Sequence, residues 1–232
     1  MSIQTEPSKR DRQKARRAER LEVEAQQRRQ AGVKRRIMIA IAAVVGVLLV
    51  GVIGYLMVQG TDSTLGVEPA TVSGDAIPPA TGAGGPQDPA VGTTVPDVTG
   101  STVDGDVVEL GATGTPQAVV FMAHWCSYCQ IEAPLIADWV DDGRLAEGVD
   151  LVAVSTRQDR ARPNWSPVEW LEREGFPGPV LIDPDDAVAE AWGLQGTPMW
   201  TFVDGEGTIV ARYAGQITPD QFAEATALAS GA

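Results

Sequence analysis

The chain has 232 residues, which is enough for one ordinary domain with additional segments. Its charge is divided, because residues 1–36 contain 12 Lys and Arg against 5 Asp and Glu, whereas residues 37–232 contain 6 against 26. The acidic larger part excludes nucleic acid as an expected partner of the folded domain.

The first two segments predict a basic tail followed by a membrane span. Residues 1–36 lack a regular apolar stripe and are interpreted as a solvated cytoplasmic tail, with contact to anionic lipid headgroups as the alternative. Residues 37–58 carry no charge, and a helix of this length spans about 33 Å, enough for a bilayer core. The run is longer than the apolar core of a cleaved signal peptide, so we predict a signal anchor. The positive-inside rule places everything after Gln59 outside the cytoplasm.

The next segment, residues 59–92, is rich in Gly, Pro, Ala and Thr. This composition predicts a flexible, disordered linker between the membrane span and the folded domain. We expect the folded domain to occupy residues 93–232.

Strands and helices are expected to alternate along the folded domain. Continuous apolar runs indicate buried strands, and Ser166 followed by Pro167 indicates the start of a helix. The alternation predicts an α/β fold with a central mixed β-sheet flanked by helices. The expected elements are a hairpin over 102–110, strands over 118–122, 149–155, 179–182, 199–203 and 208–213, and helices over 128–140, 166–174, 186–192 and 218–230.

The only two cysteines, Cys126 and Cys129, stand where a predicted strand turns into a predicted helix. Cys126 is expected at the helix N-terminus, whose unpaired N–H groups and partial positive charge favour a thiolate. Cys129 lies one turn further along the helix, within reach for a disulfide. We interpret Cys126 as the thiol that attacks a disulfide and Cys129 as the thiol that resolves the mixed intermediate.

Two other interpretations of the cysteines remain open. A structural disulfide closing so short a loop gains only about 2 kcal/mol, which makes it a poor cross-link. Metal binding is disfavoured, because two thiolates are too few for a closed zinc site and His124 is the sole histidine. We therefore expect no metal and no cofactor. His124 is expected to be an exposed loop residue, with stabilisation of a thiolate by its protonated form as the alternative.

The motifs around the cysteines resemble those of the TlpA/ResA-like membrane-tethered thioredoxins, over about residues 92–230. The resemblance implies a thioredoxin-like fold for residues 93–232. It is carried by Val95-Pro96-Asp97-Val98, the stretch from Trp125 to Pro134, Asp183-Pro184-Asp185, the stretch from Trp192 to Pro198, and the stretch from Phe202 to Gly207.

The resemblance also implies roles for single residues. Pro198 is expected to be a cis-proline that faces the cysteines, and Thr197 to offer backbone groups to an extended substrate segment. Trp125 completes the expected substrate-binding surface. Glu132 is expected near the cysteines as a proton carrier or a tuner of Cys129, the alternative being an exposed helix carboxylate.

The predicted function is a membrane-anchored extracytoplasmic thiol-disulfide oxidoreductase that reduces disulfides of exported proteins, apocytochrome c being one candidate. Ser127-Tyr128 differs from the Pro-His of strong oxidants, and few cations are expected near the site because only six arginines follow the membrane span. A membrane redox partner is needed to recycle the two cysteines. The alternatives are a disulfide-forming oxidase, a copper-binding chaperone using Cys126, Cys129 and His124, and a redox-inert scaffold of the same fold.

Overall fold

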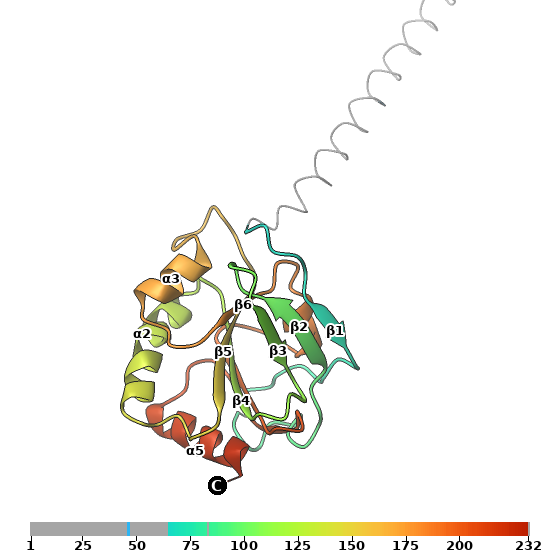
Figure 1. The fold of residues 1–232 in the computed structure, drawn as a ribbon, viewed down its shortest axis with the longest axis vertical. Helices are drawn as coiled ribbons and strands as arrows, with labels where there is room; N and C mark the ends of the chain where they lie inside the picture. Colours follow the sequence, from blue (N-terminus) through green and yellow to red (C-terminus); the bar gives the residue numbers. More distant parts are fainter. Residues whose placement is uncertain (1–45, 47–64, 83, 232) are drawn as a thin grey trace, which may run out of the picture. The chain divides into compact units, whose positions relative to one another are not determined.

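A computed structural model describes Gly46, residues 65–82 and residues 84–231 (Figure 1). The basic tail over 1–36 and, apart from Gly46, the predicted membrane span over 37–58 lie outside these residues. Within the described part of the chain, no helix is both long and apolar enough to cross a membrane.

A five-stranded mixed sheet forms the centre of the domain, as predicted. Its order is β6-β5-β4-β7-β8, in which β4, β5 and β6 are parallel while β7 and β8 are antiparallel to their neighbours. All six residues of β4 are buried, as expected of a strand covered on both faces. The strands are β4 (Gln117–Met122), β5 (Asp150–Ser155), β6 (Val180–Ile182), β7 (Met199–Val203) and β8 (Ile209–Ala214).

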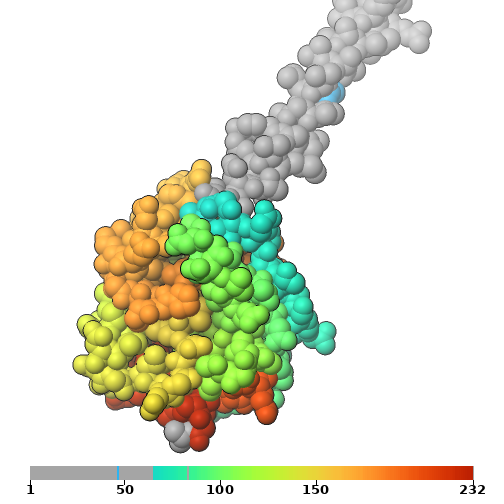
Figure 2. Space-filling view, in the orientation of Figure 1, coloured from blue at the N-terminus to red at the C-terminus, as the bar shows by residue number. Residues whose placement is uncertain are grey.

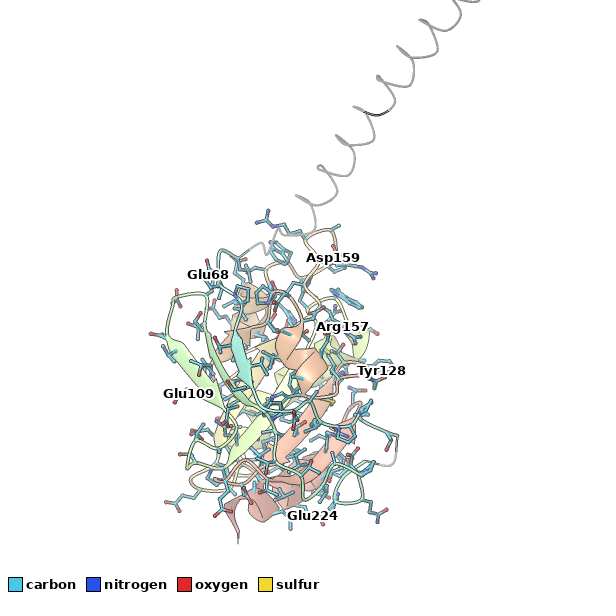
Figure 3. All side chains as sticks on the ribbon, turned by 90° about the vertical axis from the view of Figure 1, so that its right-hand side faces the viewer. Glu68, Glu109, Tyr128, Arg157, Asp159 and Glu224 are labelled. Atoms are coloured by element: carbon cyan, nitrogen blue, oxygen red, sulfur yellow. The ribbon has the colours of Figure 1, made fainter. Side chains whose placement is uncertain are left out.

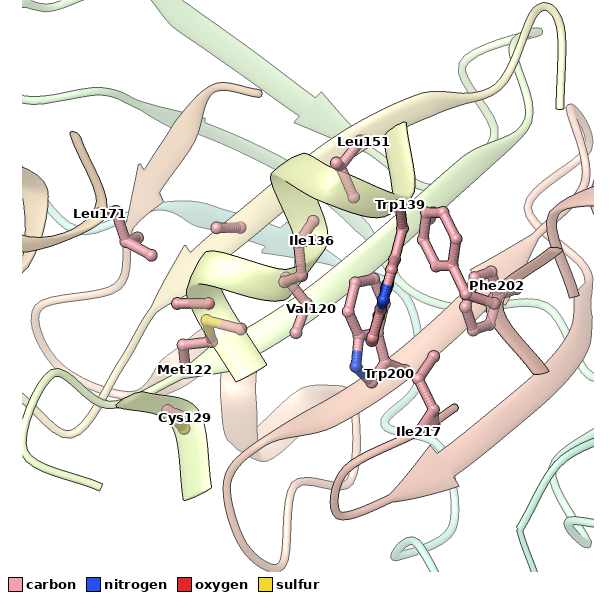
Figure 4. Packing of buried hydrophobic residues seen from close by; sticks show 14 of the residues in the cluster. Val120, Met122, Cys129, Ile136, Trp139, Leu151, Leu171, Trp200, Phe202 and Ile217 are labelled. Carbon is pink, nitrogen blue, oxygen red and sulfur yellow. The ribbon is translucent and has the colours of Figure 1, made fainter. Parts of the chain in front are cut away.

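Helices cover both faces of this sheet. Alternate residues of β4 enter two separate apolar clusters: Val120 packs with side chains from α2, α3 and α5, and Val119 packs with side chains from α4. Figure 4 shows part of the first cluster, in which Cys129 and Ile136 of α2 lie beside β4. The helices are α2 (Ser127–Asp141), α3 (Pro167–Arg173), α4 (Ala187–Ala191) and α5 (Pro219–Ser230).

Side-chain caps mark the starts of two helices, of which the cap at Ser166 was predicted. The side chain of Ser166 accepts a hydrogen bond from Glu169 N at the start of α3. Thr218 and Gln221 form a reciprocal capping box at the start of α5. These caps satisfy backbone N–H groups that would otherwise lack partners, so the local sequence determines where both helices begin.

A second, three-stranded antiparallel sheet consists of β1 (Thr71–Ser73), β2 (Asp97–Ser101) and β3 (Val107–Leu110), in the order β1-β2-β3. The predicted hairpin is therefore present, but its first strand precedes the predicted range 102–110. Gly105 in the turn has a φ of 89°, a conformation that glycine adopts without strain.

The segment 65–92 differs from the predicted flexible linker. It contains strand β1, and Ile77 and Ala80 are buried against the second apolar cluster. Their backbone N–H groups each donate a hydrogen bond of 2.9 Å, to Ala191 O and Gly193 O respectively. The packed domain therefore begins near Leu65 and not at residue 93.

A buried ion pair explains why this polar segment is held in place. Arg212 on β8 and Asp88 are both almost fully buried, and Arg212 Nη2 lies 2.6 Å from Asp88 Oδ1. Arg212 Nη1 also donates to Pro78 O at 2.9 Å, and Ala90 N donates to Asp88 Oδ1 at 2.9 Å. Because an unpaired buried charge is very costly, Arg212 requires these partners from the segment.

Candidate active site

Cys126 and Cys129 lie at the carboxyl end of β4, where the chain enters α2. Cys126 is the N-cap residue of α2, and its backbone N–H donates to Ala123 O at 2.9 Å. Cys129 lies one turn on, is fully buried, and faces the first apolar cluster. Both cysteines are free thiols, and only Cys126 is partly exposed. Cys126 is therefore the more accessible of the two thiols.

The two thiols have pKa values shifted in opposite directions. Burial by itself would raise the pKa of Cys126, but the Thr197 side chain and the backbone N–H groups of Cys129 and Tyr128 outweigh it, so the pKa lies below its ordinary value. For Cys129, burial dominates and raises the pKa far above the ordinary value of a thiol. The site therefore holds one ionisable, accessible thiol and one buried thiol that stays protonated unless a base removes its proton.

The loop before β7 faces Cys126. The Thr197–Pro198 peptide bond is cis, as predicted. The Cys126 thiol donates to Thr197 O at 3.2 Å, and Gly215 N donates to Pro198 O at 2.8 Å. These contacts place the backbone of Thr197 beside the accessible sulfur.

Glu132 lies one turn beyond Cys129 on the same face of α2 and is almost fully buried. Its Oε1 accepts a hydrogen bond of 2.8 Å from Ile217 N, while Oε2 has no hydrogen-bond partner among the described residues. Burial raises the pKa of Glu132 to about 7, although the Ile217 N–H and the nearby Trp200 indole, whose Nε1 itself has no hydrogen-bond partner among the described residues, partly oppose this shift. The alternative of an exposed helix carboxylate is thus wrong.

His124 is fully buried, so the expectation of an exposed loop residue is wrong. Its Nδ1 lies 2.6 Å from Pro163 O, and its Nε2 lies 3.2 Å from Asp159 N. Because a carbonyl can only accept and a backbone N–H can only donate, His124 is the neutral tautomer with its proton on Nδ1. Burial lowers the pKa of His124, which favours the same neutral form. Both ring nitrogens are engaged with backbone groups, so they do not face the cysteines as ligands.

Trp125 joins the site to the long loop between β5 and α3. Its indole Nε1 donates to Arg157 O at 2.7 Å. The guanidinium carbon of Arg162 lies 4.6 Å from the centre of the Trp125 ring, within the range of a cation–π contact. Figure 3 shows Arg157 and Asp159 of this loop on the same side of the molecule as Tyr128 of α2.

This loop concentrates positive charge next to Trp125, although no arginine is among the causes that shift the pKa of Cys126. Three of the six arginines after the predicted membrane span, Arg157, Arg160 and Arg162, fall within six consecutive residues of the loop. Their concentration was visible in the sequence as a cluster, but its place beside Trp125 depends on contacts more than 30 residues apart along the chain.

No group of three or more His, Cys, Asp and Glu side chains is arranged to hold a metal ion in the described ranges 65–82 and 84–231. The groups that the site offers for chemistry include the two thiols and the buried carboxyl of Glu132. An accessible thiolate can attack a disulfide, and a buried thiol one turn away can attack the resulting mixed disulfide.

The fold and the paired cysteines define a thioredoxin-like protein. Residues 90–229 match the protein-family model described as Redoxin, and the chain belongs to this family. This confirms the resemblance found in the motifs at the level of the family.

Several curated relatives are similar to the cysteine-containing domain. The thiol:disulfide interchange protein HelX of Rhodobacter capsulatus is 31% identical over 110 residues, which are 46% of this chain and 56% of HelX. The thiol-disulfide oxidoreductase ResA of Geobacillus thermodenitrificans is 27% identical over 132 residues, 56% of this chain and 73% of ResA. The chain thus spans little more than half the length of HelX. The crystal structure of StoA from Bacillus subtilis is 22% identical, with a TM-score of 0.48, over 60% of this chain and 99% of StoA.

Proposed function

We propose that this protein is a membrane-anchored extracytoplasmic thiol-disulfide oxidoreductase that reduces disulfides of exported proteins. The observation that carries the proposal is the placement of two free thiols within one helical turn, with Cys126 partly exposed at the N-terminus of α2 and Cys129 fully buried. The pKa shifts, lowered at Cys126 and raised at Cys129, agree with this placement. The names of HelX and ResA, which describe disulfide interchange and thiol-disulfide oxidoreduction, support the same activity.

In the first step, the Cys126 thiolate attacks one sulfur of a substrate disulfide. A bond forms between Cys126 Sγ and that sulfur, the substrate S–S bond breaks, and the second substrate sulfur leaves as a thiolate. The backbone of the partly exposed Thr197 lies beside Cys126, which supports docking of the substrate there as an extended segment. Trp125 and Pro198, which neighbour Cys126 and Thr197 in sequence, complete the proposed binding surface.

In the second step, Cys129 resolves the mixed disulfide. Its raised pKa means that a base must take its proton, and Glu132, with a pKa of about 7, is the candidate on the same helix face. Glu132 Oε2 has no hydrogen-bond partner in the described part of the chain and is the atom proposed to receive the proton. Cys129 then attacks Cys126 Sγ: the Cys126–Cys129 disulfide forms and the bond between Cys126 and the substrate sulfur breaks. The substrate leaves with both of its sulfurs reduced, having gained two electrons from the protein. A membrane redox partner must return those electrons.

The proposed location rests on the sequence of the first 58 residues. The uncharged run over 37–58 follows a tail with an excess of seven positive charges, a pattern that favours a cytoplasmic N-terminus. A reporter active only outside the cytoplasm should be active when fused after Ala232, and a reporter active only inside should be silent there. The reverse pattern would refute the orientation.

A disulfide-forming oxidase is the second candidate for the net direction. The lowered pKa of Cys126 favours the reduced protein, and a stabilised reduced form makes a protein oxidising. The lowered pKa of Cys126 therefore favours an oxidase, whereas the lack of a Pro-His dipeptide between the cysteines favours a reductase.

The activity is tested by reduction of insulin with dithiothreitol, using the full chain in a neutral detergent. Wild type should accelerate the reaction, whereas Cys126→Ser should not. Leu228→Ser, a change at an exposed position on α5, is the matched control and should retain the wild-type rate. Equal rates for wild type and Cys126→Ser would contradict the proposed activity.

A further inference from the structure

The loop between β5 and α3, next to the residues that precede Cys126, carries a positive charge, whereas the domain as a whole is negative. Residues 65–231 contain 25 Asp and Glu against 6 Arg, yet the stretch 157–162 contains three of those arginines and one aspartate. The loop lies at the surface of the domain, between β5 and α3 (Figure 2). An acidic polypeptide is repelled by most of this domain and attracted to this loop.

Hydrogen bonds attach the loop to the two residues that precede Cys126. His124 Nδ1 donates to Pro163 O at 2.6 Å, and His124 Nε2 accepts from Asp159 N at 3.2 Å. Trp125 Nε1 donates to Arg157 O at 2.7 Å. These three hydrogen bonds therefore fix the position of the loop relative to Trp125 and to the reactive sulfur that follows it.

The arginine side chains remain at the surface. Arg162 lies over the Trp125 ring with 55% of its side chain exposed, and its Nε lies 3.3 Å from Asp159 Oδ2. Asp159 is itself 47% exposed, so this pair is weak and can exchange for another carboxylate. Arg160 is exposed and lies 5.6 Å from the centre of the Trp165 ring. The pKa of Cys126 is lowered by the Thr197 side chain and by backbone N–H groups. Lowering this pKa is therefore not the role of the arginines.

We propose that the loop 157–162 makes the protein prefer disulfides whose cysteine is flanked by acidic residues. Arg160 and Arg162 would be specificity residues that contact the carboxylates of the substrate while Cys126 attacks its sulfur. The inference rests on the proposed function, and the exchange is unchanged: the Cys126–sulfur bond forms, the substrate S–S bond breaks, and the leaving sulfur departs as a thiolate. Each contact of a carboxylate with an exposed arginine is modest, and the longer-range attraction between opposite charges adds to it at low salt.

The test uses three peptides that carry one cysteine as a neutral 2-pyridyl disulfide, flanked by two Glu, two Gln or two Lys. The full chain with Cys129→Ser, in neutral detergent, reacts once at Cys126, and released 2-thiopyridone is followed by its absorbance. Each rate is divided by the rate of the same peptide with 2-mercaptoethanol, which corrects for intrinsic reactivity. The Glu peptide should react about five-fold faster than the Lys peptide at low salt, and this ratio should approach one near 1 M salt.

Two variants decide whether the loop causes this preference. The double variant Arg160→Glu/Arg162→Glu should invert the order, so that the Lys peptide reacts fastest, a gain that misfolding does not produce. Arg144→Gln, which removes a cation paired with Asp220, is the matched control and should keep the original order. Equal corrected rates for the three peptides, or an order unchanged in the double variant, would overturn the preference alone. Failure of every peptide to modify Cys126 would overturn the proposed function as well.

Discussion

Replacing Glu132 with glutamine removes a buried ionisable group while keeping an oxygen that can accept from Ile217 N. Burial raises the pKa of Glu132 from 4.5 to about 7, which corresponds to about 3 kcal/mol between its two protonation states. Because the folded-state pKa is the higher one, the stability that the neutral carboxyl provides is complete below about pH 4.5. It is lost as the pH rises through about 7. Glu132→Gln should therefore gain stability relative to the parent as the pH rises.

The assay is urea unfolding at several pH values, with Cys126→Ser and Cys129→Ser in both proteins so that no thiol titrates. The difference in unfolding free energy between Glu132→Gln and its parent should change by about 3 kcal/mol between pH 4.5 and pH 8. A difference that does not depend on pH would refute the raised pKa.

The same substitution should slow resolution of the mixed disulfide. With both cysteines present at pH 7, Glu132→Gln should accumulate the adduct at Cys126, because removing a general base costs about 100-fold or more. Asp183→Asn is the matched control: Asp183 is also buried with its pKa raised to about 6, but it caps α4 through Val188 N and Ala189 N. Accumulation in both variants, or in neither, would contradict a specific role for Glu132.

Three further predictions concern the two thiols and the segment 65–92. The rate at which iodoacetamide modifies Cys126 should rise with pH with a midpoint below the ordinary thiol pKa, while Cys129 in the folded protein stays unmodified. Peptide mass analysis measures both, and equal labelling of the two cysteines would contradict their difference in burial. Equilibration with glutathione should give a potential nearer to the −270 mV of thioredoxin than to about −120 mV, the value expected of an oxidase. Asp88→Ala should lower the unfolding free energy by about 3–5 kcal/mol in urea, because it leaves the buried Arg212 charge unpaired; a loss below about 1 kcal/mol would indicate that the pair does not hold the segment 65–92.

The strand, the cysteines and the following helix could be predicted because their signals are local. A buried apolar run ending four residues before Cys126 identifies the strand, and the spacing of the two cysteines fits one helical turn. The cis state of Pro198 came from the resemblance and not from any local pattern. The sequence leaves two interpretations of Glu132 open, because the contact that decides between them is with Ile217, 85 residues away.

The misjudged features depend on contacts distant in sequence. His124 is buried by a loop that begins about 30 residues later, and nothing in the residues next to it indicates this. The segment 65–92 has the composition of a linker, yet Asp88 pairs with Arg212, which is 124 residues away. Composition describes average behaviour, whereas one buried charge can order a polar segment.

The most direct test of the central claim is to identify which cysteine carries a trapped substrate. Cys129→Ser should form a stable mixed disulfide with an exported protein or a disulfide peptide, and mass analysis should place the bond at Cys126. Cys126→Ser should form none, because Cys129 is fully buried and its pKa is raised. Trapping by Cys126→Ser, or no adduct with Cys129→Ser, would contradict the assignment of Cys126 as the attacking thiol.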